Sequence, residues 1–239
     1  RNNLEVAAPI LKERGLTASF FIATGFIEGG CMFNDVVLEA LRASTQELDL
    51  TDLGFGRYEF PDDAARQRAL SDILPRLKYF EPDKRQAATE QLAERAGLAS
   101  LPRLMMNERE LRELAACGMD IGGHTVSHPI LTKLPEEGAL AEIKDCKQSL
   151  EAILGRRVSS FAYPNGRPGE DYRVDHVLMV EQVGYRVAVS TSSGSARRGQ
   201  DPRQLPRIAP WDRDGLRYAV RIGRAYLKAG ATMESKTPL

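Results

Sequence analysis

Amphipathic segments alternate with short apolar runs along most of the chain. Apolar residues recur at helical spacing over residues 4–11, Gly15 interrupts the pattern, and residues 17–23 then form an apolar run typical of a buried strand. Three further units repeat this order, with predicted helices at residues 107–117, 135–154 and 173–183 and predicted strands at 119–122, 158–162 and 186–190. Helices that alternate with short strands predict parallel strands joined by crossovers, so we expect an α/β layered fold or a barrel.

Residues 31–105 break this alternation. They contain a predicted helix at 34–42, a candidate hairpin at 48–60 and two charged helices at 62–78 and 82–95. Asp62 and Asp63 open the first charged helix, where carboxylates favour the N-terminus. Charged helices cannot all face one apolar core without burying unpaired charge. We therefore expect residues 1–30 and 106–239 to form the α/β core and residues 31–105 to form an inserted, mainly helical cap region.

Composition narrows the class of protein. The 239 residues are 42% hydrophobic, which suffices for one substantial core, and 33 Lys and Arg residues balance 33 Asp and Glu residues. A neutral chain offers no basic field for nucleic acid, and no apolar run reaches the roughly 18 residues of a membrane span. Three cysteines at unrelated spacings indicate neither a disulfide framework nor a zinc finger.

The chain begins at Arg1 and enters a helical pattern at once, so we expect residues upstream of Arg1 to be missing. Localisation therefore stays open between the cytoplasm and the cell envelope, and the oligomeric state is open as well.

Two of the three histidines, His124 and His128, stand four residues apart directly after a predicted strand. One helical turn would place both imidazoles on one face, where they could share a metal ion. Gly122 and Gly123 would let the backbone bend out of the strand into that turn. Two histidines at this spacing can also be hydrogen-bonded core residues, and both interpretations are open on spacing alone. His176, on a predicted helix without a partner at ligand spacing, is interpreted as structural.

Two motifs make a resemblance specific. Gly-His-Thr-Val-Ser-His at residues 123–128 resembles the second motif of the polysaccharide deacetylases, the NodB-homology family of carbohydrate esterases. Ser-Phe-Ala-Tyr-Pro-Asn-Gly at residues 160–166 resembles the third motif in the form used by a bacterial branch of that family. Residues 2–21 resemble the stretch that follows the family's first motif. The resemblance covers the chain except residues 31–105 and about the last twenty.

The resemblance implies a distorted β/α barrel that hydrolyses N-acetyl or similar N-acyl groups on an amino-sugar polysaccharide or oligosaccharide. It implies one divalent metal, with zinc as the first choice and cobalt or nickel as alternatives. One Asp and two His hold this metal in the family, and His124 and His128 match the two His positions. A second Asp acts as the base, and the backbone N–H that matches Tyr163 helps to stabilise the oxyanion.

The chain also departs from the family pattern. The Asp-Asp pair of the first motif is absent, so the third metal ligand, the base and the first strand of the barrel are expected upstream of Arg1. Arg207, in a segment that resembles the end of the same bacterial branch, could orient the expected Asp or could be a surface residue on an edge strand. Pro164, Asn165 and Trp211 are candidate substrate-binding residues. Trp211 could stack on a sugar ring or could cap the barrel.

The sequence therefore predicts a metal-dependent deacetylase-like hydrolase with a carbohydrate substrate, no nucleic-acid partner and no membrane span. One alternative is an amidohydrolase that acts on a small N-acyl or ureido compound. Another is a carbohydrate-binding relative that has kept the fold and lost the chemistry.

Overall fold

The structure is a computed structural model that describes residues 1–239 except 30, 46, 102, 210, 211, 213, 229–232 and 234–239. It divides into two compact units. The smaller comprises residues 26–107 together with Arg1, and the larger comprises residues 2–25 and 108–239. The smaller unit encloses the whole of the predicted insertion, residues 31–105.

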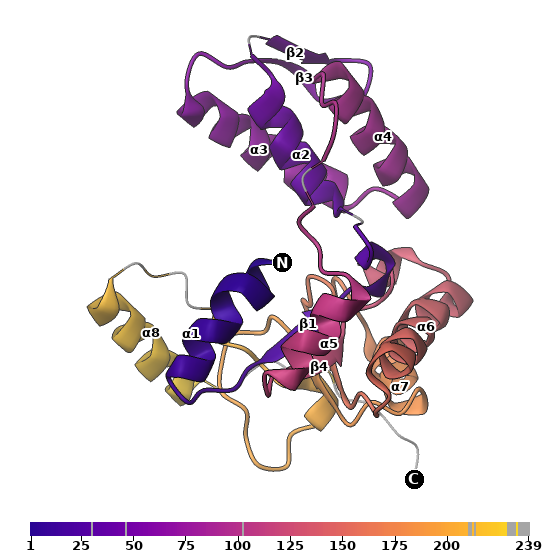
Figure 1. Ribbon diagram of the computed structural model, residues 1–239, viewed down its shortest axis with the longest axis vertical. Coiled ribbons are helices and arrows are strands. Elements are labelled where there is room, and N and C mark those ends of the chain that lie inside the picture. Colours follow the sequence, from indigo (N-terminus) through magenta and orange to yellow (C-terminus); the bar gives the residue numbers. More distant parts are fainter. Residues whose placement is uncertain are drawn as a thin grey trace. The chain divides into compact units, whose positions relative to one another are not determined.

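The larger unit is built on a four-stranded sheet in the order β1-β4-β5-β6, formed by β1 (Ser19–Ile22), β4 (Asp120–Gly123), β5 (Ser160–Ala162) and β6 (Val187–Val189). Figure 1 labels the neighbouring strands β1 and β4. All three strand pairings are parallel, so the four predicted strands and their parallel arrangement are confirmed. A parallel bridge between Val189 and Leu205 continues the sheet beyond β6. Every residue of β5 is buried, as expected for a central strand of a parallel sheet.

Helices connect these strands, as the crossover rule requires. The larger unit contains a π-helical turn (Asn3–Ala7), α1 (Ala8–Glu13), α5 (Glu108–Ala116), α6 (Glu136–Leu154), α7 (Val174–Gln182), α8 (Gly215–Leu227) and the 3-10 turns Leu131–Lys133 and Pro202–Gln204; a further 3-10 turn, Thr24–Phe26, follows β1. Helix α6 packs against β4, α5 and α7. Its buried side chains, which repeat at helical spacing, are those of Ala139, Ile143, Cys146 and Leu150. Gly155, at a φ of 63°, ends this helix in the left-handed region that favours glycine.

The smaller unit has its own hydrophobic core. It consists of α2 (Phe33–Ala43), the antiparallel hairpin β2 (Glu47–Leu50) and β3 (Gly56–Glu59), α3 (Asp63–Lys78) and α4 (Pro82–Arg95). Leu41, Leu50, Ile73 and Leu92 are among the fully buried residues of this core. The charged helices α3 and α4 thus bury their apolar stripes within their own unit and leave most of their charged side chains in water. Arg85 of α4 is buried, with its guanidinium over the Phe33 ring.

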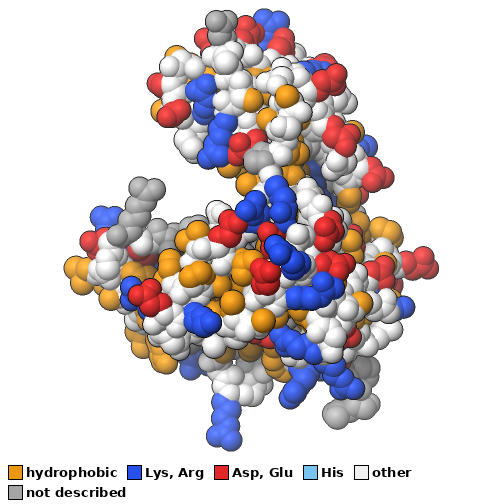
Figure 2. All heavy atoms as spheres, viewed as in Figure 1, with side chains coloured by type: hydrophobic (Ala, Val, Ile, Leu, Met, Phe, Trp, Pro, Cys, Tyr) orange, Lys and Arg blue, Asp and Glu red, His pale blue; other side chains and the backbone are white. Residues whose placement is uncertain are grey.

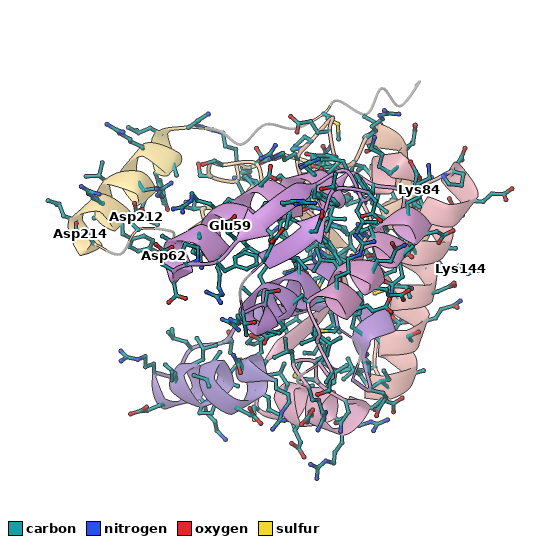
Figure 3. All side chains as sticks on the ribbon, turned by 90° about the horizontal axis from the view of Figure 1, so that it is seen from above. Glu59, Asp62, Lys84, Lys144, Asp212 and Asp214 are labelled. Carbon is teal, nitrogen blue, oxygen red and sulfur yellow. The ribbon has the colours of Figure 1, made fainter. Side chains whose placement is uncertain are left out.

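Asp62 caps helix α3. Its carboxylate accepts a hydrogen bond of 2.7 Å from the Ala65 N–H, and Figure 3 shows Asp62 where the chain enters α3 after Glu59. The Asp62–Asp63 pair is therefore a helix start, as the sequence indicates.

Replacing Asp62 by Ala is expected to destabilise the protein by about 1 kcal/mol, because an N-terminal N–H of α3 loses its acceptor. Urea unfolding would measure this loss, and Asp62→Asn, which retains a capping oxygen, should restore most of it. Unchanged stability of Asp62→Ala would contradict this capping role.

Acidic and basic side chains are interspersed over the visible face of the molecule (Figure 2), in keeping with the zero net charge. In the part of the chain that the structure describes, no helix combines the length and apolar character needed to cross a membrane.

Candidate active site

The carboxyl ends of the parallel strands bring the motif residues to one edge of the sheet. His124 follows β4, Tyr163 follows β5, Ser190 follows β6, and Thr24 lies two residues beyond the end of β1. Because all four strands are parallel, these residues lie at the same edge, where parallel α/β proteins assemble their sites. Two residues predicted from separate motifs, His124 and Tyr163, are therefore brought to neighbouring strand ends.

His124 and His128 contact each other. Their ring centroids lie 4.6 Å apart, and the rings meet edge to face at 68°. The two imidazoles are half-buried. The structure thus brings together the two histidines that the sequence singles out.

The backbone between them is a loop and not the helical turn that the spacing suggested. Thr125 and His128 have φ angles of 67° and 55°, in the left-handed region that residues other than glycine rarely adopt. The Thr125 hydroxyl donates to the His124 carbonyl and accepts a 3.1 Å hydrogen bond from the His128 N–H. Two left-handed residues, and not one helical turn, fold His128 back toward His124.

The glycines before His124 also serve a different purpose from the one expected. Gly122 and Gly123 remain in strand β4, and neither has a positive φ. A Cβ at Gly122 would lie 2.6 Å from the Phe21 ring and 2.7 Å from Ser160 Oγ, and a Cβ at Gly123 would overlap the Tyr185 hydroxyl. The glycine pair therefore makes room for large neighbours on both sides of the strand.

The ring of His124 is held in one tautomer. Its Nδ1 lies 2.6 Å from the carbonyl oxygen of Ala162, the last residue of β5. Because a carbonyl can only accept, Nδ1 carries the proton, and the lone pair of the neutral ring is on Nε2. Burial lowers the pKa of His124 to about 4; the positive charge of Arg207 acts in the same direction, and the bond to Ala162 opposes it. His124 is therefore a neutral imidazole at pH 7.

The low pKa of His124 has a consequence for stability. In the unfolded chain this side chain takes up a proton near its ordinary pKa of 6.5, but in the folded protein it does so only near pH 4. The unfolded state thus binds more protons over this interval, so we expect the free energy of unfolding to decrease as the pH falls from about 6.5 toward 4.

NMR titration of the metal-free protein would measure the pKa directly, and urea unfolding at pH 7 and pH 5 would measure the slope. His124→Gln should make that slope smaller. A His124 ring that titrates at pH 6 or above would contradict the prediction.

Two neighbouring elements hold the loop that carries the histidines. After β1, the Thr24 and Gly25 N–H groups donate to the carbonyls of Thr125 at 3.1 Å and Val126 at 2.9 Å. From α6, the Glu142 carboxylate accepts from the Val126 and Ser127 N–H groups at 2.7 and 2.8 Å. The sequence analysis missed Glu142. The signal that could have found it is a carboxylate beside the buried stripe of an amphipathic helix, next to the buried Ile143.

Tyr163 is placed differently from what its predicted role requires. Its N–H donates to the Val189 carbonyl at 3.2 Å, which continues the β5–β6 pairing. Its ring is fully buried and stacks on Tyr172 with centroids 3.8 Å apart, and its hydroxyl donates to the Arg203 carbonyl at 3.0 Å. The expectation that this N–H stabilises an oxyanion is corrected, because the sheet already uses it.

The candidate substrate-binding residues fall in different environments. Pro164 is buried, and Asn165 is half-buried in the loop after β5, with a φ of 58°. Thr191 fixes this loop, since its hydroxyl donates to the Asn165 carbonyl at 2.7 Å. Trp211 lies outside the described residues, so its predicted stacking on a sugar remains a prediction.

Arg207 lies near the imidazole pair. Its Nε donates to the Ser190 carbonyl at 2.7 Å, and its charge contributes to the lowered pKa of His124. Partial burial also lowers the pKa of Arg207 itself. The side chain is therefore half-buried and fixed at the carboxyl edge of the sheet, which differs from a solvated arginine on an edge strand.

His176 stands apart from this site in its role. It is buried, and its Nδ1 accepts a 2.9 Å hydrogen bond from the Arg173 N–H at the start of α7. His176 thus accepts from the backbone N–H of the N-cap residue, as the third helical residue does in a capping box. This contact supports the interpretation of His176 as a structural residue.

A metal ion would find two ligands in this site. The imidazoles of His124 and His128, which contact each other, have the donor chemistry of a zinc, cobalt or nickel site. Within the described residues, no group of three or more His, Cys, Asp or Glu side chains could hold a metal ion. The residues present therefore fit two ligand positions of a shared metal, and the described part of the chain supplies no third.

Parallel strands with crossover helices and an imidazole pair at their carboxyl edge define an α/β protein with a candidate hydrolytic metal site. A family model for polysaccharide deacetylase matches residues 61–188, more than half of the chain. The chain belongs to the polysaccharide deacetylase family.

Individual relatives agree with this assignment. The chain is 28% identical over 103 residues to YxkH of Bacillus subtilis (strain 168), whose name describes it as a polysaccharide deacetylase. The match covers 43% of this chain and 36% of YxkH. The chain thus spans about a third of the length of this curated relative.

Two solved structures share the fold. The deacetylase PplD of Streptococcus pyogenes, in complex with acetate, matches with a TM-score of 0.51 and 20% identity over 87% of this chain and 58% of that one. IcaB from Ammonifex degensii matches with a TM-score of 0.53 and 14% identity, and the match covers 92% of this chain and 66% of the IcaB chain. The larger unit therefore has the α/β fold of the NodB-type deacetylases.

Proposed function

We propose that this protein is a metal-dependent hydrolase that removes N-acetyl groups from an amino-sugar polysaccharide or oligosaccharide. The observation that carries the proposal is the His124–His128 pair, with centroids 4.6 Å apart at the carboxyl edge of a parallel sheet. Membership of the polysaccharide deacetylase family supports the substrate class. The acetate in the PplD complex is the product expected of such a reaction.

Zinc is the metal we propose, with cobalt or nickel as alternatives. His124 would bind it through Nε2, because the Nδ1 proton is donated to Ala162. The remaining ligands would be water, substrate or a carboxylate outside the described residues. A divalent metal in this site would polarise the acyl carbonyl and lower the pKa of a bound water.

Other residues of the chain would position the reacting groups. Since the sheet uses the Tyr163 N–H and Pro164 has none, Asn165 carries the next backbone donor for a developing oxyanion. Arg207, fixed by Ser190, presents a guanidinium fork that suits a carboxylate, so we propose that it orients the acidic residue that acts as base.

The test is metal-dependent release of acetate from an N-acetylated chito-oligosaccharide, with zinc or cobalt supplied. The chain of 239 residues would be compared with one extended upstream in the native reading frame. Higher activity of the extended chain would show that the base lies upstream, and equal activity would show that it lies within residues 1–239.

Two outcomes would favour another function. Hydrolysis of small N-acyl or ureido amides without acetate release from the oligosaccharide would indicate a small-molecule amidohydrolase. Oligosaccharide binding without hydrolysis by either chain would indicate a carbohydrate-binding relative that has lost the chemistry.

A further inference from the structure

Glu142 on helix α6 contacts the histidine loop with its whole carboxylate. Oε2 accepts hydrogen bonds from the N–H groups of Val126 and Ser127 at 2.7 and 2.8 Å, and Oε1 accepts one from the Ser127 hydroxyl at 2.6 Å. One side chain thus binds three donors from two consecutive residues between His124 and His128.

The backbone of this loop is suited to bind an anion. Thr125 is left-handed, with a φ of 67°, and the N–H groups of the next two residues both point to one carboxylate oxygen. Successive N–H groups after such a residue form a concave site for negative charge. In this chain the anion is supplied internally, by Glu142.

The loop needs such support because its conformation is unfavourable. Thr125 and His128 both have positive φ angles, which side chains with a Cβ rarely adopt. Such conformations persist only when their surroundings fix them. On one side the loop is bonded to Thr24 and Gly25 after β1, and on the other side the Glu142 carboxylate of α6 accepts from Val126 and Ser127.

We infer that Glu142 is a positioning residue that holds His124 and His128 together as a preformed pair of metal ligands. The inference rests on the proposed function, since it assigns Glu142 a role toward the metal of that site. Without the carboxylate, the loop can relax from its left-handed conformation and the two rings can separate. Partners that orient metal ligands in this way contribute about 10- to 100-fold to metal affinity.

The experiment measures two quantities in each variant: hydrogen exchange of the Val126 and Ser127 amides in metal-free protein, and zinc affinity by competition with a chelator. Glu142→Ala should speed amide exchange and weaken zinc binding about 10- to 100-fold. Glu142→Gln should stay near wild type, because the amide oxygen can accept from both N–H groups while the amide nitrogen donates to the Ser127 hydroxyl.

Asp145→Ala is the matched control, since it removes an exposed carboxylate from the same helix. Lys144, the residue before it, points away from the protein in Figure 3. If Glu142→Ala does not fold, Ser127→Ala takes its place, because it removes only the 2.6 Å hydroxyl contact. Ser127→Ala should lower zinc affinity by a smaller factor. Glu142→Gln should leave zinc affinity near that of wild type.

Unchanged exchange and unchanged zinc affinity in Glu142→Ala would overturn the inference. If wild-type protein binds no zinc, the proposed metal function fails, and the exchange measurement decides on Glu142 separately. Faster exchange of the two amides would then support its role in holding the loop, and unchanged exchange would refute it.

Discussion

Replacing either His124 or His128 by Ala is expected to weaken zinc binding by more than about a hundredfold and to abolish metal-dependent acetate release. Each histidine would supply one of only two protein ligands found in the described residues, so its removal leaves a single imidazole. The effect should therefore exceed that of any change in the residues that orient the ligands.

His176→Gln is the control for these variants. His176 accepts from the Arg173 N–H at the start of α7, and Gln at the same position can make the same capping contact. Zinc affinity should be unchanged in this variant. If all three variants bound zinc as tightly as wild type, the His124–His128 contact would be a polar packing contact and not a metal site.

Replacing Gly123 by Ala is expected to destabilise the protein by about 1–3 kcal/mol, the range of overpacking changes in a core. The new Cβ would overlap the Tyr185 hydroxyl and lie 2.9 Å from its Cζ and 3.3 Å from Cys146 Sγ. The Tyr185 ring has little freedom to move, since it packs on Phe161 at 5.0 Å and Lys147 lies over it.

Gly138→Ala provides the comparison. Gly138 lies inside α6 without a positive φ, and a Cβ there would approach its nearest neighbour, Pro135, only to 3.5 Å. This change should stabilise the protein by at most about 0.5–1 kcal/mol, the cost of glycine in a helix interior, because Gly138 lies in the first turn of α6. Urea unfolding of both variants measures the difference. Equal stability of Gly123→Ala and wild type would show that the Tyr185 ring can move aside.

Much of the fold could be predicted because it follows from local periodicity. Each strand of the sheet is a short segment that follows a glycine, mostly apolar in β1, β5 and β6, and each connecting helix carries an apolar stripe at helical spacing. Local start and stop signals were equally readable, as at Asp62, which begins α3, and Gly155, which ends α6. Helix α8 was missed, although Asp214 precedes it and caps it by accepting from the Arg217 N–H.

The candidate site could be predicted only in part. The spacing of His124 and His128 correctly predicted that the two side chains lie close together. The expected helical turn between them is instead a loop with two left-handed residues. Tyr163 was located correctly after a strand, but its N–H belongs to the sheet. In both cases the residue could be read from the sequence and its hydrogen-bond partner could not.

The sequence by itself determined the order of helices and strands, the parallel sheet and the identity of the paired histidines, because these depend on neighbours along the chain. Only the tertiary structure decided that Gly123 makes room for Tyr185, that Ala162 fixes the tautomer of His124, and that Glu142 holds the loop. These contacts join residues between 15 and 62 positions apart. Periodicity specifies which face of an element is buried, but only packing of the elements specifies which atoms meet there.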